Sequence, residues 1–194
     1  TTICDCVPNV VPDECTVWYY IRAPKREDVD YVYRWLCDCA KGAALMTQTT
    51  FDIEFLTGCS NVMPNDVLEK VMLSAYKDVG APKFTEEAAV EQFLAPHADD
   101  VINDFIVPLM DTEECLKGST DVGDVSWVCP TAQINAVTEA AGTPGHSWQM
   151  TAYSGHHVGF ASMLCAAKVL GVSGLRLLED PELIRMAWEN FHEN

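Results

Sequence analysis

The first third of the chain alternates between extended and helical patterns. Residues 14–24 (ECTVWYYIRAP) form a β-branched and aromatic run closed by Ala-Pro, which predicts a strand. Residues 25–45 carry apolar side chains at helical spacing and acidic residues in the first turn, which predicts a helix. Residues 49–59 alternate Phe51, Ile53 and Phe55 with acidic residues, as in a half-exposed strand. This β-α-β unit ends near residue 62, and by itself it is incomplete because two isolated strands are marginally stable.

The rest of the chain has the pattern of helices around a glycine-rich region. Asn65 is placed to cap a helix that ends near Gly80, and residues 85–110 have helical spacing on both sides of Pro96. Residues 116–150 carry four glycines between short apolar runs, which favours loops. A buried helix is expected over residues 158–170, and a last helix starts with Asp180 as N-cap followed by Pro181. The change of pattern at residues 62–66 predicts two parts, residues 1–62 and 63–194.

Composition narrows the class of protein. Hydrophobic residues make up 48% and charged residues 21%, as in globular proteins, and we find neither a signal peptide nor a spanning segment in the sequence. The net charge of −17 argues against nucleic acid and anionic membranes as partners, because both attract clustered Lys and Arg. Nine cysteines, an odd number without zinc-ribbon spacing, favour reduced thiols and a cytoplasmic location.

His146 is the first candidate for chemistry. It follows a Gly-Thr-Pro-Gly turn in the stretch GTPGHSWQ, and such a turn gives a rigid loop of the kind that a metal-binding histidine needs. No other ligand stands at a fixed spacing from it. From the residues alone, a metal ligand and an ordinary loop histidine both remain open.

Three further groups have a functional and a structural interpretation. Asp121 and Asp124 lie in a glycine-flanked turn, where they are either acid, base or metal groups or, more commonly, turn-capping residues. His156 and His157 precede a helix; only one would face a given site if the segment is extended, and capping is the alternative. Arg22 ends an apolar strand, where its guanidinium either grips a carboxylate or reaches solvent.

Together the stretches PNVVPDECTVWYYIRAP, AKGAALMT, GSTDVGDVSWVCPTAQ and GTPGHSWQ, in this order, resemble the zinc-dependent amidohydrolases and peptidases related to aminoacylase and glutamate carboxypeptidase. The branch that acts on aminobenzoyl-glutamate is the most similar. The resemblance implies an α/β fold: residues 1–62 are the second half of an α+β, ferredoxin-like dimerisation lid, and residues 63–194 are the C-terminal part of a zinc-peptidase-like catalytic domain.

Family roles carry over only to matching positions. Asn9 and Arg22, thirteen positions apart, match the pair that binds the substrate carboxylate on the lid. Asp121 and Gly145 fall in motifs that line the substrate site. His146 matches the last metal ligand, with His156 and His157 as alternatives, because the nearest branch carries a histidine where this chain has Phe160. The resemblance thus implies a divalent metal, zinc with manganese or cobalt as alternatives.

The chain also departs from the family pattern. The family's His-x-Asp motif and matching Glu-Glu pair, which supply most ligands and the catalytic glutamate, have no counterpart here, so no catalytic residue is assigned. We therefore expect the C-terminal portion of a homodimeric or larger amidohydrolase that cleaves the amide bond of an N-acyl or aminobenzoyl amino acid and is inactive as this chain alone, where the metal itself can be absent. The alternative is a non-enzymatic truncated homologue that serves association or small-molecule binding.

Overall fold

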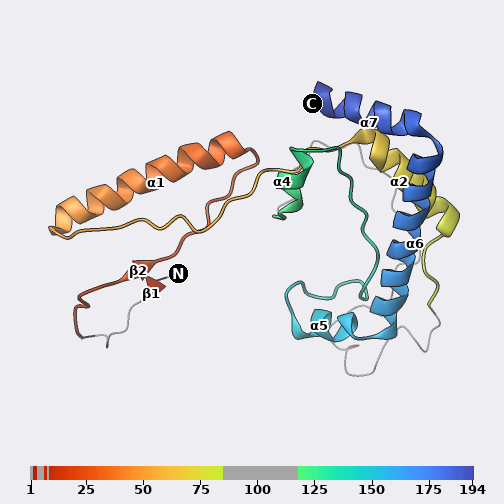
Figure 1. Ribbon diagram of the computed structural model, residues 1–194. Helices are drawn as coiled ribbons and strands as arrows, with labels where there is room; N and C mark the ends of the chain where they lie inside the picture. The colour runs from red at the N-terminus through yellow and green to blue at the C-terminus, as the bar shows by residue number, and fades with distance from the viewer. Residues whose placement is uncertain (1, 4–6, 8, 85–117) are drawn as a thin grey trace. The chain divides into compact units, whose positions relative to one another are not determined.

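The computed structural model describes residues 2–3, 7, 9–84 and 118–194 (Figure 1). The chain divides into two compact units: the first contains residues 1–61 and 115–124, and the second contains residues 62–114 and 125–194. The helical segments predicted on both sides of Pro96 lie outside the described residues.

The first unit is built on one long helix and extended segments. Strand β1 (Thr2–Ile3) pairs antiparallel with β2 (Thr16–Val17), and Thr2 lies opposite Val17. Helix α1 (Arg26–Thr47) follows, with an Arg26–Asp30 ion pair of 2.9 Å in its first turn. It ends at Gln48, whose left-handed backbone (φ 57°) lets its N–H donate to the Ala44 carbonyl. The predicted helix is confirmed.

The strands predicted in this unit differ from those observed. Only Thr16–Val17 of residues 14–24 forms a strand, and residues 49–59 are extended without a ladder to any described residue. Phe51, Ile53 and Phe55 are exposed, and the Phe55 ring meets the edge of Tyr33 on α1 at 5.7 Å rather than a neighbouring strand. A strand needs a hydrogen-bonded partner, so the predicted β-α-β pattern is not formed by the described residues.

The second unit packs its helices around α6 (His157–Glu179), which contacts α2 (Asp66–Val79), α5 (Trp148–Ser154) and α7 (Pro181–Glu193). One core cluster joins Ala75 and Tyr76 of α2 to Cys165 and Val169 of α6. A second joins a loop and the two helices that follow it through Ala140, Tyr153 and Val158. The α/β catalytic domain and the ferredoxin-like lid stay predictions.

Local signals in the sequence set the ends of these helices. Asn65 caps α2, because its side chain accepts a hydrogen bond from the Leu68 N–H at 3.1 Å. Asp180 caps α7 by accepting from the Glu182 N–H at 3.1 Å, and Pro181 occupies the first position. Both caps were predicted and are confirmed.

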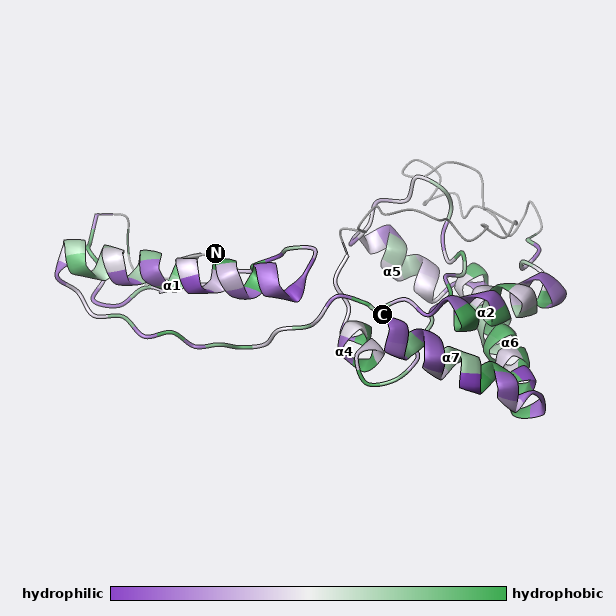
Figure 2. Ribbon diagram, turned by 90° about the horizontal axis from the view of Figure 1, so that it is seen from above, coloured by the Kyte–Doolittle hydropathy of each residue, from purple (hydrophilic) through white to green (hydrophobic). Residues whose placement is uncertain are grey.

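Helix α6 is the most apolar element, and it is coloured largely green in Figure 2. Among the described helices it alone is long and apolar enough to cross a membrane by length and composition, with a mean hydropathy of 1.7 in its best window. This is weak evidence for a membrane span, since the core helix of a soluble protein has the same properties.

Candidate functional site

A tight turn places His146 at the entrance of helix α5. Gly142 adopts a positive φ of 77°, and the Thr143 hydroxyl donates to the Ala140 carbonyl at 2.8 Å. His146 itself has a left-handed backbone (φ 56°), which is uncommon for a residue with a side chain. Ser147 then caps α5: its hydroxyl donates to the Pro144 carbonyl at 2.6 Å and accepts from the Met150 N–H at 3.4 Å. The loop is therefore held at both ends.

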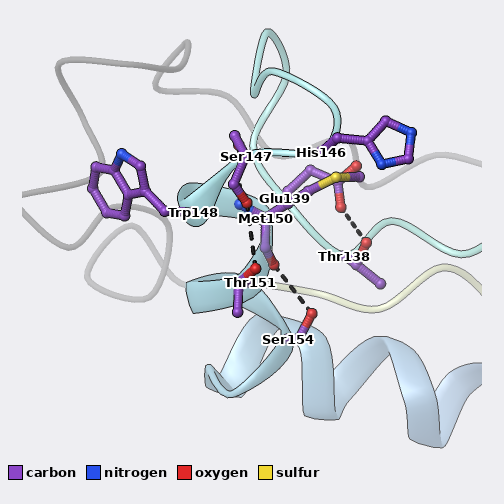
Figure 3. A pocket seen from close by; sticks show the side chains of 8 residues that line it. All are labelled: Thr138, Glu139, His146, Ser147, Trp148, Met150, Thr151 and Ser154. Carbon is purple, nitrogen blue, oxygen red and sulfur yellow. Dashed lines mark hydrogen bonds between the residues drawn. The ribbon is translucent and has the colours of Figure 1, made fainter. Parts of the chain in front are cut away.

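The turn and α5 enclose an open pocket of about 650 Å³ (Figure 3). The residues that line it are Thr138, Glu139, His146, Ser147, Trp148, Met150, Thr151 and Ser154. In Figure 3 the imidazole of His146 lies on the same side as Thr138 and Glu139, and the Trp148 indole lies on the other. The pocket thus combines an imidazole and a carboxylate with an exposed aromatic surface.

Glu139 was missed by sequence reasoning. It is an exposed residue that accepts a hydrogen bond from the Thr138 hydroxyl. Seven positions separate it from His146, and the Gly-Thr-Pro-Gly turn between them reverses the chain so that both side chains line one pocket. A carboxylate on the other arm of a glycine-proline turn was the signal that pointed to it.

His156 and His157 lie at the next helix end. His156 caps α6, and its Nδ1 accepts from the Val158 N–H at 3.4 Å, so the capping interpretation is confirmed for this residue. The two imidazole centroids are 3.8 Å apart. The expectation that adjacent side chains point apart is wrong here, because His156 is extended while His157 begins the helix and the chain turns between them.

Asn9, Arg22 and Asp121 belong to the first unit, whereas Gly145 and His146 belong to the second. Asn9 and Arg22 are exposed or half-buried surface residues, and the Arg22 guanidinium carbon lies 6.0 Å from the centroid of the Tyr20 ring. Gly145 has open space where a side chain would begin, so packing does not demand a glycine there. The substrate-binding roles of these residues stay predictions.

Asp121 and Asp124 differ in their surroundings. Asp121 is exposed and precedes the short helix α4 (Val122–Ser126). The Asp124 carboxylate accepts from the Ser60 N–H at 2.8 Å, and this bond, together with the Ser60 hydroxyl, lowers its pKa. Asp124 therefore anchors residues 58–61 on α4, as the turn-capping interpretation implies.

A metal site needs about three protein ligands. The pocket supplies His146 and Glu139, and no group of three His, Cys, Asp or Glu residues suited to a metal ion occurs within residues 9–84 and 118–194. The residues at hand therefore do not complete a metal centre, and we derive no chemical step through a metal from them.

The comparison with known proteins identifies the class. The chain is 33% identical to the p-aminobenzoyl-glutamate hydrolase subunit designated B in Escherichia coli (strain K12), over 92% of its own length and 43% of that protein. It is 29% and 26% identical to the Xaa-Arg dipeptidases of Mus musculus and Homo sapiens, over 95% of its own length and 37% of each. No protein-family model matches the sequence.

The chain is therefore a homologue of hydrolases that act on amide and peptide bonds, as its motifs indicated. It belongs to the family that contains p-aminobenzoyl-glutamate hydrolase and Xaa-Arg dipeptidase, and this resemblance is confirmed. The chain spans less than half the length of these relatives.

Proposed function

We propose that this chain is the C-terminal portion of a metal-dependent amidohydrolase that cleaves the amide bond of an N-acyl or aminobenzoyl amino acid. Similarity to the Escherichia coli p-aminobenzoyl-glutamate hydrolase over 92% of the chain carries the proposal. The pocket supports it, because an aromatic acyl group can stack on the exposed Trp148 ring while His146 and Glu139 face the polar end of the substrate.

The residues of this chain would bind and orient rather than complete the reaction. We propose His146 as one ligand of a divalent metal, zinc or alternatively manganese or cobalt, whose remaining ligands lie outside the described residues. When bound, such a metal activates water for attack on the amide carbonyl. Asn9 and Arg22 hold the substrate carboxylate, and Asp121 and Gly145 line the substrate site. The planar guanidinium of Arg22 suits a carboxylate because it donates two parallel hydrogen bonds.

The chain alone should be inactive. A single histidine and a single glutamate in an open pocket do not hold a catalytic metal that needs about three protein ligands. We expect no turnover of p-aminobenzoyl-glutamate by the purified chain with zinc, manganese or cobalt, relative to a blank with the metal alone. Turnover above that blank would show that the ligand set is complete within the chain.

A fusion tests the function directly. In this fusion, the chain replaces the matched region of the Escherichia coli hydrolase. We expect the fusion to hydrolyse p-aminobenzoyl-glutamate, and His146→Asn to remove the activity because asparagine tolerates the left-handed backbone but offers no imidazole. His192→Asn, a change at a surface histidine near the end of α7, is the matched control and should keep the activity. An active His146→Asn fusion would contradict the assigned role.

The non-enzymatic alternative has its own outcome. A folded but inactive fusion, combined with binding of p-aminobenzoyl-glutamate to the chain in calorimetry, would indicate a small-molecule-binding module. Self-association and a cytoplasmic location are also proposals. Exposed aromatic residues of the first unit, among them Tyr20, Tyr31 and Trp35, support association of copies, and light scattering tests it.

A further inference from the structure

One face of α6 presents large apolar side chains to solvent. Six of them are at least half exposed, with exposed fractions from 50% for Phe160 to 78% for Leu178. They are Phe160, Met163, Leu164, Leu170, Leu175 and Leu178. Their spacing of three, four and seven residues puts them on one side of the helix.

The opposite face of α6 is the one packed inside the unit, and its buried residues are small. Ser162 donates to the Val137 carbonyl, Ser173 donates to the Val169 carbonyl at 2.8 Å, and Cys165 packs in the core cluster with α2. The bulkiest apolar residues of the helix therefore do not contribute to the core that the described residues form.

The exposed face is large for an isolated protein. From Phe160 to Leu178 it extends about 27 Å along the helix, at a rise of about 1.5 Å per residue. The most apolar window of the helix contains at most two charged residues, so charge hardly interrupts the face. Monomeric soluble proteins rarely leave such a patch uncovered, because burying it is favourable.

The lengths of the relatives indicate what covers this face. The alignments take 92–95% of this chain but only 37–43% of each relative, so more than half of each relative has no counterpart in these residues. Nearly all of the chain, α6 included, therefore corresponds to a part of a much larger folded protein. A helix with one face packed by its own unit and the other face apolar fits a position between two layers.

We propose that the exposed face of α6 is the docking surface for the complementary part of the hydrolase fold, which is the part of the relatives that has no counterpart in these residues. The partner presents an apolar layer to α6, on the same polypeptide or on a second one. This inference rests on the proposed function, because both assign the chain to such a hydrolase.

The first experiment measures docking without activity. The purified chain is mixed with the part of the Escherichia coli hydrolase outside the matched region, and complex formation is followed by calorimetry and light scattering. We expect a one-to-one complex. Met163→Glu with Leu170→Glu should weaken it roughly tenfold or more, because two carboxylates would be buried without partners. Lys168→Glu makes the same change in net charge at an exposed α6 position across the helix from these two residues, and it should leave the affinity unchanged.

The second experiment compares melting temperatures. In the isolated chain the double variant should melt as the unaltered chain does, because both side chains are exposed. In the fusion it should lower the melting temperature by about 5 °C or more, since there the face would be covered. A lower melting temperature of the isolated double variant would mean that the chain covers the face itself, and this outcome overturns the proposal.

Other occupants of the face give distinct results. A self-associated species that the double variant disperses would assign the face to a second copy, and sedimentation with phosphatidylcholine vesicles would assign it to a membrane; each overturns the proposal. No complex, or no effect of the double variant in either experiment, also overturns it. A fusion that hydrolyses substrate despite these results keeps the proposed function, whereas a docked but inactive fusion keeps only the docking.

Discussion

The side chain of Asn65 caps α2 and at the same time donates a hydrogen bond to the Ala187 carbonyl of α7 at 2.9 Å. Asn65 is 1% exposed, so water does not replace either bond. One amide thus fixes the start of one helix to the middle of another, 122 positions later in the chain.

Removal of this amide should cost more than removal of an exposed cap. We expect Asn65→Ala to lower the free energy of unfolding by about 2–3 kcal/mol, because a cap and a buried hydrogen bond are lost together. Asp180→Ala removes the exposed cap of α7 and should cost about 1 kcal/mol. Urea unfolding measures both, and equal losses would show that the bond to Ala187 contributes nothing.

Two glycines of α6 should respond oppositely to alanine. A Cβ at Gly159 would lie 2.5 Å from the Tyr153 carbonyl oxygen, so Gly159→Ala should destabilise the chain by about 1–3 kcal/mol through overpacking. A Cβ at Gly171 meets no atom within 4 Å, and Gly171→Ala should stabilise the helix by roughly 0.5–1 kcal/mol. Thermal unfolding decides, and stabilisation by both would place Tyr153 elsewhere.

The Asp124 carboxylate should titrate below its ordinary pKa. The hydrogen bonds from Ser60 favour the charged form, so the stability that they contribute is present above the ordinary value of 3.8 and is lost as pH falls through the lower folded value. The Ser60 amide proton, followed by NMR, should report a midpoint below 3.8. Asp124→Asn keeps an acceptor oxygen but does not titrate, so the same resonance should stay flat in that variant.

The left-handed backbone at His146 makes a prediction that is independent of function. His146→Asn should change the free energy of unfolding by less than about 0.5 kcal/mol, since asparagine adopts this conformation readily. His146→Val should cost about 1–2 kcal/mol, because a β-branched side chain does not. Should valine be tolerated as well as asparagine, the turn before α5 is not held in this conformation.

Arg22 should act on the free carboxylate of the substrate. In the fusion, Arg22→Lys should raise KM for p-aminobenzoyl-glutamate by about ten- to a hundredfold and leave the bound metal in place, because lysine offers a point charge instead of a two-pronged donor. A substrate with an amidated carboxylate should be hydrolysed equally by both. Equal weakening of both substrates, or loss of metal, would make Arg22 a structural residue.

Predictions from the sequence succeeded where the signal is local. Asn65, Asp180 and Pro181 fix helix ends through bonds to residues only a few positions away, and the spacing of apolar residues gave α1. They failed where a distant partner decides. The strand expected at residues 49–59 has no ladder partner among the described residues, and no local pattern shows whether one exists.

The candidate site shows the same division. His146 was found because a glycine-proline turn marks a rigid loop, and the described pocket contains it. Glu139 was not, because its place in the pocket depends on how the turn folds back. Helix α6 was expected to be buried and shorter. Its apolar composition shows that its surface favours burial, but not that its own unit covers only one side.

The bonds that hold the start of α2 have a consequence for synthesis. Asn65 bonds to Ala187, the Asp66 N–H donates to Asn190 at 2.9 Å, and Asn194 donates to the Pro64 carbonyl at 3.0 Å, across separations of 122, 124 and 130 residues. Contacts between such distant residues form late, because the intervening chain must first be ordered. On the ribosome, α2 is therefore translated long before these three partners exist. The nascent second unit must wait for its last helix before this anchor can close.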